Sequence, residues 1–163
     1  MYQKIILSLT TAFLVGCGVQ TDSVTKPSMF QSVHEKEAVL LQEGKDKESC
    51  PRCGMNLPKY YKTNHSALLD KKTYQYCSIH CLQDHLYDDV SLKNPLVVDV
   101  DTLKFIDATK AYYVVGSSVK GTMSRVSKYA FATKEKAELF QKENGGEIVD
   151  FYKALEIAKK DFK

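Results

Sequence analysis

Two closely spaced pairs of cysteines and an adjacent methionine are the residues of this chain best suited to chemistry. Met55 follows the first pair, Cys50 and Cys53, and the second pair, Cys77 and Cys81, comes later in the chain. Thiolate and thioether sulfurs are soft donors that suit monovalent copper, zinc and iron–sulfur chemistry. The pattern therefore predicts a soft-metal site, with Cu(I) as the favoured ion and zinc as the alternative.

The predicted local structure favours thiolates at these positions. Cys81 falls in the first turn of a predicted helix, where the positive end of the helix dipole lowers the pKa of a thiol. Gly54 allows the backbone to bend back after Cys53. Because metals bind thiolates rather than thiols, both features favour metal ligation over inert buried cysteines.

The methionines discriminate between metals, because thioether ligation selects Cu(I) and contributes little to a zinc site. Met55 is placed to project beside the sulfur of Cys53, although a lone methionine usually fills a hydrophobic core. Met123 lies in the small-residue segment 121–124. Such a loop is suited to act as a mobile lid that supplies a labile further donor.

Two histidines are additional candidate metal ligands. His85 follows Cys81 by one turn of the predicted helix, and His65 opens a predicted β-hairpin. The alternative for each is a solvated surface side chain. The sequence contains no evident paired carboxylates, Ser/His/Asp set or phosphate-binding glycine loop, so it predicts no catalytic residues.

The N-terminus predicts export. One lysine and a short apolar run form a secretory signal that is too short to span a bilayer of roughly 30 Å. The run ends in Leu14-Val15-Gly16-Cys17, which resembles the lipobox of bacterial lipoproteins. That resemblance implies cleavage before Cys17 and acylation of this cysteine, including palmitate, which would anchor the protein to a membrane.

These features divide the chain into a signal peptide over 1–16, a lipid anchor and flexible linker over 17–44, and a metal-binding domain over 45–163. We expect a membrane-anchored lipoprotein that faces the periplasm or another extracytoplasmic space. In an exported protein the other four cysteines can also form two disulfides, which stays open as an alternative. The net charge of +3 is too mild to indicate nucleic-acid binding.

Apolar periodicity predicts alternating strands and helices. In the first half, short aromatic and apolar runs within 60–77, separated by a charged turn at Lys71-Lys72, predict a hairpin. A helix capped by Ser78 and a strand over 96–100 that follows Pro95 come after it. The second half repeats this order, with a helix capped by Thr133. Further predicted segments are a short helix within 31–44, strands over 103–107, 111–116, 128–132 and 147–150, and a closing helix capped by Asp150. Two β-β-α-β units in one compact domain define an α+β fold.

Several of these motifs together resemble the accessory lipoprotein of nitrous oxide reductase, the NosL family. The resemblance is carried by Cys17, Cys53-Gly54-Met55, Gly121-Thr122-Met123 and the segment from Tyr129-Ala130-Phe131-Ala132 to Gly145-Gly146. It implies a Cu(I) carrier without enzymatic activity that helps to metallate the reductase and works with a copper-handling membrane transporter. It also implies that Cys53 and Met55 are the first copper ligands and that Met123 is a further one.

Three additional cysteines depart from the simplest pattern of that family. Cys50, Cys77 and Cys81, taken with Cys53, also resemble the small metal-sensing modules of the TRASH type. Either all four thiols and Met55 form one copper site, or some cysteines form a structural zinc site or a disulfide beside the copper site. Two rival functions follow, an interaction module held by a four-cysteine zinc site and a thiol–disulfide oxidoreductase that uses Cys50-Pro51-Arg52-Cys53.

Overall fold

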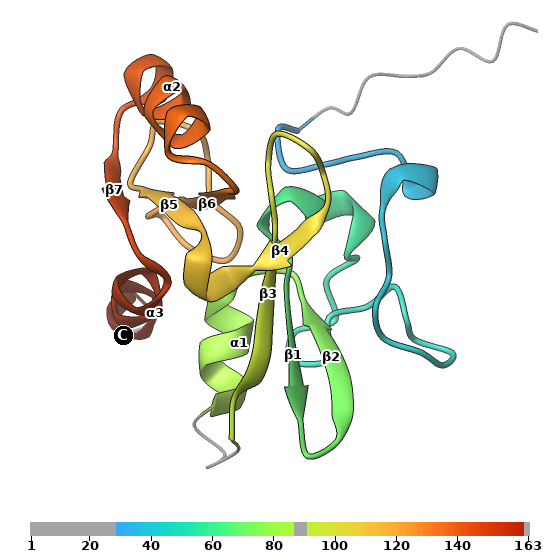
Figure 1. The fold of residues 1–163 in the computed structure, drawn as a ribbon. Coiled ribbons are helices and arrows are strands. Elements are labelled where there is room, and N and C mark those ends of the chain that lie inside the picture. The colour runs from blue at the N-terminus through green and yellow to red at the C-terminus, as the bar shows by residue number, and fades with distance from the viewer. Residues whose placement is uncertain (1–28, 87–90, 162–163) are drawn as a thin grey trace, which may run out of the picture.

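The structure is a computed structural model that describes residues 29–86 and 91–161. The predicted signal peptide and Cys17 lie outside the described residues. The described part folds into two antiparallel sheets with three α-helices packed around them (Figure 1).

The first unit contains β1 (His65–Leu69), β2 (Lys72–Tyr76), α1 (Ile79–Leu86) and β3 (Lys93–Val98), followed by β4 (Phe105–Asp107). Its strands are ordered β2-β1-β3-β4, and every neighbouring pair is antiparallel. A two-residue turn with positive φ at Asp70 (47°) and Lys71 (68°) joins β1 to β2, as the twist of a tight hairpin requires. This turn lies one residue earlier than Lys71-Lys72, where the sequence suggested it.

The second unit repeats the topology of the first. It contains β5 (Tyr112–Val115), β6 (Lys128–Phe131), α2 (Lys134–Asn144) and β7 (Glu147–Val149), with strand order β6-β5-β7, and α3 (Phe151–Asp161) closes the chain. In both units the first strand is central and pairs antiparallel with the second and third strands. The prediction of an α+β fold made of two β-β-α-β units is therefore confirmed.

Local caps position the helices of the second unit as predicted. The Thr133 side chain accepts a hydrogen bond from the backbone of Lys136 at the start of α2. The Asp150 carboxylate accepts one from the backbone N–H of Lys153, 2.8 Å away, and this bond caps α3. Gly145 then follows α2 with φ of 71°, a conformation that glycine adopts without a Cβ penalty.

A shared core joins the two units. Figure 1 shows α1 of the first unit beside α3 of the second, and these helices pack together. The main core cluster combines Tyr76, Ile79 and Leu82 with Tyr113 and Phe151, all of them buried. Cys50, Cys77 and Cys81 belong to the same cluster. The thiols are therefore held where the two units meet, and the core that positions them is also the core that stabilises the fold.

Three predictions for the first unit are wrong. The segment around Tyr60 is not a strand, because residues Pro58–Thr63 form a short 3-10 helix whose first residue, proline, is preset for a helical turn. The Ser78 hydroxyl does not cap α1, since it is buried without a hydrogen-bond partner among the described residues. Pro95 lies inside β3 instead of before it, opposite a register shift in β1 where a ladder N–H is not needed.

Residues 29–44 contact the rest of the domain. The predicted helix within 31–44 reduces to a single 3-10 turn, Glu35–Glu37, and residues 39–42 run beside β2. Gln75 fastens them there, because its backbone N–H donates to Gln42 (3.0 Å) and its side chain accepts from the N–H of Leu41 (2.8 Å). Part of the predicted linker over 17–44 thus contacts the domain through Leu41 and Gln42.

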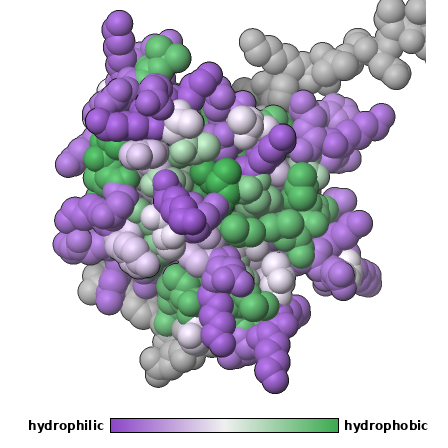
Figure 2. All heavy atoms as spheres, in the orientation of Figure 1, coloured by the Kyte–Doolittle hydropathy of each residue, from purple (hydrophilic) through white to green (hydrophobic). Residues whose placement is uncertain are grey.

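Hydrophilic side chains cover much of the face drawn in Figure 2, with apolar areas between them. Within the described residues, no helix is long and apolar enough to cross a bilayer.

Candidate metal centre

A tight loop positions the first two thiols. Residues 51–53 form a turn, the N–H of Gly54 donates to the carbonyl of Cys50 (2.8 Å), and the N–H of Cys50 donates to the carbonyl of Met55 (2.8 Å). Gly54 has φ of 74°, which allows the chain to reverse. The loop therefore returns Met55 to the side of Cys50. It differs from a thioredoxin-like motif, in which the second cysteine lies in a helix.

The second pair is positioned by the junction of a strand and a helix. Cys77 directly follows β2, and Cys81 is the third residue of α1. The Thr63 hydroxyl donates to the carbonyl of Cys77 at 2.8 Å, which fixes the backbone at this junction. Both thiols point into the core beneath the loop that carries the first pair, since both are buried.

The four thiol sulfurs converge. All four Sγ atoms lie within 4.8 Å of one another. The sulfur of Cys77 lies 3.4 Å from that of Cys53, 3.7 Å from that of Cys81 and 3.8 Å from the Sδ of Met55. For metal–sulfur bonds of about 2.3 Å, tetrahedral ligands lie roughly 3.8 Å apart. The cluster therefore has the size of a sulfur-ligated metal site, and Met55 points towards it rather than into a separate core.

Burial divides the sulfurs into two groups. Cys50, Cys77 and Cys81 are 2%, 0% and 2% exposed, whereas Cys53 is exposed and Met55 is half-buried. An ion held by these sulfurs would be shielded from solvent on the side of α1 and accessible on the side of the loop.

Mutual hydrogen bonds shift the pKa values of the buried thiols in opposite directions. The thiols of Cys77 and Cys81 donate to Cys50 and lower its pKa, because the thiolate form is then stabilised. The same bonds raise the pKa values of Cys77 and Cys81, and burial adds to this effect. These directions favour a thiolate at Cys50 and thiols at Cys77 and Cys81. For Cys81 the direction is opposite to the lowering of the pKa predicted from the helix dipole, because its hydrogen bond to Cys50 and its burial outweigh the dipole.

The loop that carries Met123 is connected to the thiol cluster by a contact between two hydroxyl groups. The Thr63 hydroxyl, which binds the carbonyl of Cys77, is also 2.8 Å from the hydroxyl of Thr122. Met123 follows this link, has φ of 62°, and packs half-buried against the core cluster that contains the buried cysteines. The structure thus brings the Met123 loop to the backbone of Cys77, while Met55 makes the direct thioether contact.

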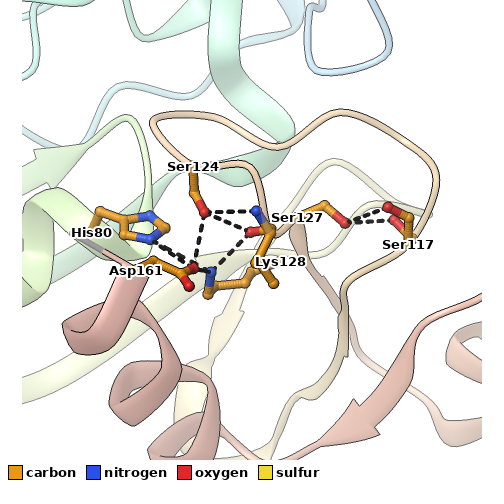
Figure 3. Close-up of polar contacts among 7 residues, drawn as sticks. His80, Ser117, Ser124, Ser127, Lys128 and Asp161 are labelled. Carbon is orange, nitrogen blue, oxygen red and sulfur yellow. Dashed lines mark hydrogen bonds and ion pairs between the residues drawn. The ribbon is translucent and has the colours of Figure 1, made fainter. Parts of the chain in front are cut away.

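Side-chain contacts hold the Met123 loop at its base and at its flank (Figure 3). Ser117 and Ser127 join the two ends of the loop through their hydroxyls, 2.7 Å apart. Ser124 donates to the Asp161 carboxylate at 2.9 Å, and the same carboxylate forms an ion pair with Lys128, whose side chain is only 2% exposed. The loop expected to be a mobile lid is therefore fastened to the last turn of α3.

The predicted histidine ligands are not part of the converging group, which within the described residues consists of the four cysteines. The ring of His85 contacts the Tyr76 hydroxyl through Nδ1 at 2.7 Å. His65 is fully buried, with Nδ1 3.0 Å from the carbonyl of Thr63 and Nε2 3.1 Å from the Tyr113 hydroxyl. Burial lowers the pKa of His65 to about 3, so it is neutral and serves to join the two units.

Two features around the site have no signal in the sequence. Arg52, between the first two cysteines, forms an ion pair with Asp84 of α1 at 2.7 Å and ties the loop to the helix below it. The link between Thr63 and Thr122 joins residues 59 positions apart. The only sequence signal for either contact is that a charged or hydroxyl-bearing residue lies near a cysteine motif, which is common in proteins.

The fold and the site define a class of protein: two β-β-α-β units whose common core presents converging sulfurs, which is a soft-metal-binding domain. A sequence model of the NosL family matches residues 41–157, so this chain belongs to the NosL family. Among solved structures, the chain is similar to the copper chaperone NosL from Shewanella denitrificans, with 28% identity and a TM-score of 0.52 over 68% of this chain and 91% of that one. The comparison with curated proteins found no match.

Proposed function

We propose that this protein is a lipid-anchored metallochaperone that binds Cu(I) and delivers it for the maturation of nitrous oxide reductase. Membership of the NosL family and similarity to a copper chaperone support a copper-binding chaperone. The observation that carries the proposal is the sulfur of Met55, 3.8 Å from that of Cys77 and beside the exposed Cys53. A thioether in this place favours Cu(I) over zinc.

Ligand exchange is the mechanism that this geometry supports. A sulfur ligand of the acceptor would add to Cu(I) on the open side, where Cys53 and Met55 lie. The thioether, the weaker donor, would leave first, and Cys53 would follow. Because Cys77 is buried and would keep its bond until the acceptor is attached, the ion would move without release to water and without a change of oxidation state.

Anchoring and partners complete the proposal. Acylation of Cys17, at the end of the predicted signal peptide, would hold the domain at a membrane on its extracytoplasmic side. There it would work with nitrous oxide reductase and a copper-handling membrane transporter. The protein would act by binding and transfer, without catalysing a reaction.

Competition for Cu(I) tests this function. We expect the reduced full chain to take Cu(I) from a chromogenic chelator, and the double variant Met55→Leu, Met123→Leu to compete less well. Met29→Leu is the matched control, since it removes a thioether near the N-terminal edge of the described residues and should leave the affinity unchanged. A chain that fails to compete, or a double variant with unchanged affinity, would contradict the proposal.

A structural zinc site is the second candidate. Four thiols within 4.8 Å of one another, three of them buried, match the size of a closed tetrahedral site that stabilises a fold. The protein would then act as an interaction module. Metal analysis after purification separates the two candidates, because stoichiometric zinc that Cu(I) does not displace would favour the zinc site.

A further inference from the structure

The five sulfurs of the site can be divided by burial into two groups of three that share Cys77. The buried thiol sulfurs of Cys50, Cys77 and Cys81 lie within 4.8 Å of one another, and those of Cys77 and Cys81 are 3.7 Å apart. We call these three thiols the inner triangle. The sulfur of Cys77 also lies 3.4 Å from that of Cys53 and 3.8 Å from that of Met55, and we call these three sulfurs the outer triangle.

The two triangles differ in environment. Every sulfur of the inner triangle is buried in the core between α1 and the loop, with residue exposures of 2%, 0% and 2%. The outer triangle adds an exposed thiol and a half-buried thioether, both from the short loop that ends at Met55. Cys50 begins the same loop, but its thiol is buried in the packed core, as are those of Cys77 at a strand end and Cys81 in α1, whereas Cys53 and Met55 lie on the solvent side.

The chemistry of Cu(I) fits this division. Cu(I) binds sulfur in low-coordinate geometries, and a thiolate sulfur has lone pairs for two metal ions. Four thiolates around one Cu(I) would carry a net charge of −3, and a second Cu(I) reduces it to −2. Since a net charge in a largely buried site is costly, the second ion lowers that cost. A single zinc ion would use all four thiolates and leave the thioether of Met55 without a role.

We infer that the chain holds two Cu(I) ions bridged by the Cys77 thiolate, an inner ion in the inner triangle and an outer ion in the outer triangle. The inner ion is retained, and the outer ion is the one passed to an acceptor. This inference rests on the proposed function, because it takes Cu(I) as the cargo. Each thiol that binds gives its proton to solvent, and copper stays Cu(I) throughout.

The retained ion has a consequence for transfer. It keeps Cys77 deprotonated and in place, so that the outer triangle is preformed each time that it is reloaded. The chain would therefore transfer one ion per cycle while it carries two.

The number of bound ions tests the inference. The full chain with Cys17→Ala, which leaves four thiols, is purified in detergent, reduced, and titrated anaerobically with a weak Cu(I)–acetonitrile complex. Native mass spectrometry counts the ions, and X-ray absorption detects copper–copper scattering. We expect two Cu(I) ions with such scattering, and one readily removed by a chelator. Met29→Leu, the matched control, should keep both.

Variants of each triangle separate the two sites. Met55→Leu and Cys53→Ser should leave one tightly held ion without copper–copper scattering. Cys50→Ser should leave one labile ion, with circular dichroism used to confirm that this buried variant folds. If the wild-type chain binds one Cu(I) and the Cys50→Ser variant binds one Cu(I) equally tightly, the inner site would be overturned and the carrier function would stand. A chain that binds no Cu(I) would overturn both, and one zinc beside one copper would overturn the bridged pair.

Discussion

Replacing Asp161 with asparagine should destabilise the domain and loosen the loop that carries Met123. Lys128 is 2% exposed in its side chain, and its ammonium pairs with the Asp161 carboxylate, which also accepts from Ser124. Removing one partner of a buried ion pair costs roughly 3–5 kcal/mol. Because the Asp161 side chain is 17% exposed, water screens part of this loss, and we expect about 2–3 kcal/mol.

Thermal unfolding followed by circular dichroism measures the effect. A loss of about 2–3 kcal/mol should lower the Tm by roughly 5–10 °C in a domain of this size. Glu156→Gln is the matched control on the same helix, since its carboxylate pairs only with exposed lysines and its loss should leave the Tm unchanged. Adding Lys128→Met to Asp161→Asn should recover part of the Tm, because the unpaired buried charge is then gone.

The same variant should alter copper handling. With Ser124 released from Asp161, the loop moves more freely, and Cu(I) should pass to a chelator faster than from the wild-type chain. A Tm within 1–2 °C of the wild type, about the size of a sub-kcal/mol effect, would refute the reasoning about the buried pair. A lowered Tm with an unchanged transfer rate would show that the Met123 loop does not control the rate of copper release.

Three further predictions concern the surroundings of the site. Thr122→Val should cost about 1 kcal/mol in urea unfolding and weaken Cu(I) retention, because it breaks the hydroxyl link to Thr63; equal retention by both chains would contradict this. The pKa of His65 is lowered from 6.5 to about 3, so as the pH falls below 6.5 the unfolded chain binds a proton at this residue that the folded chain does not. The free energy of unfolding should therefore decrease by up to about 1.4 kcal/mol for each pH unit of acidification from 6.5 to about 3. His65→Gln should remove that slope, and an unchanged slope would show that other groups cause it. Since the pKa values of Cys77 and Cys81 are raised and metal must displace their protons, the apparent Cu(I) affinity should rise with pH in chelator competition, and a flat profile would contradict that linkage.

The repeated order of elements was predictable because its signals are local. Thr133 and Asp150 each precede a helix whose apolar positions recur with helical periodicity, and both side chains cap as expected. The strand predicted around Tyr60 failed because aromatic residues suit a buried 3-10 turn as well as a sheet, and Pro58 decides between them.

The cluster of thiols was also predictable, but its internal contacts were not. Cysteine spacing indicates that sulfurs can converge, whereas the central place of Cys77 depends on how the loop packs over the start of α1. His65 shows that residue position alone can also suggest a ligand wrongly. Its position beside the hairpin suggested a ligand, but Tyr113 from the second unit reaches its Nε2, a contact 48 residues distant in sequence. Long-range pairs of common residue types leave no local pattern.

The most direct test of the account is the rate at which the Cu(I)-loaded chain gives copper to an acceptor as the acceptor concentration rises. Exchange through an exposed Cys53 and a labile Met55 predicts that the rate increases in proportion to the acceptor, since the new ligand adds before the old ones leave. A rate that does not depend on the acceptor concentration would mean that copper is first released to water. That result would contradict the transfer mechanism.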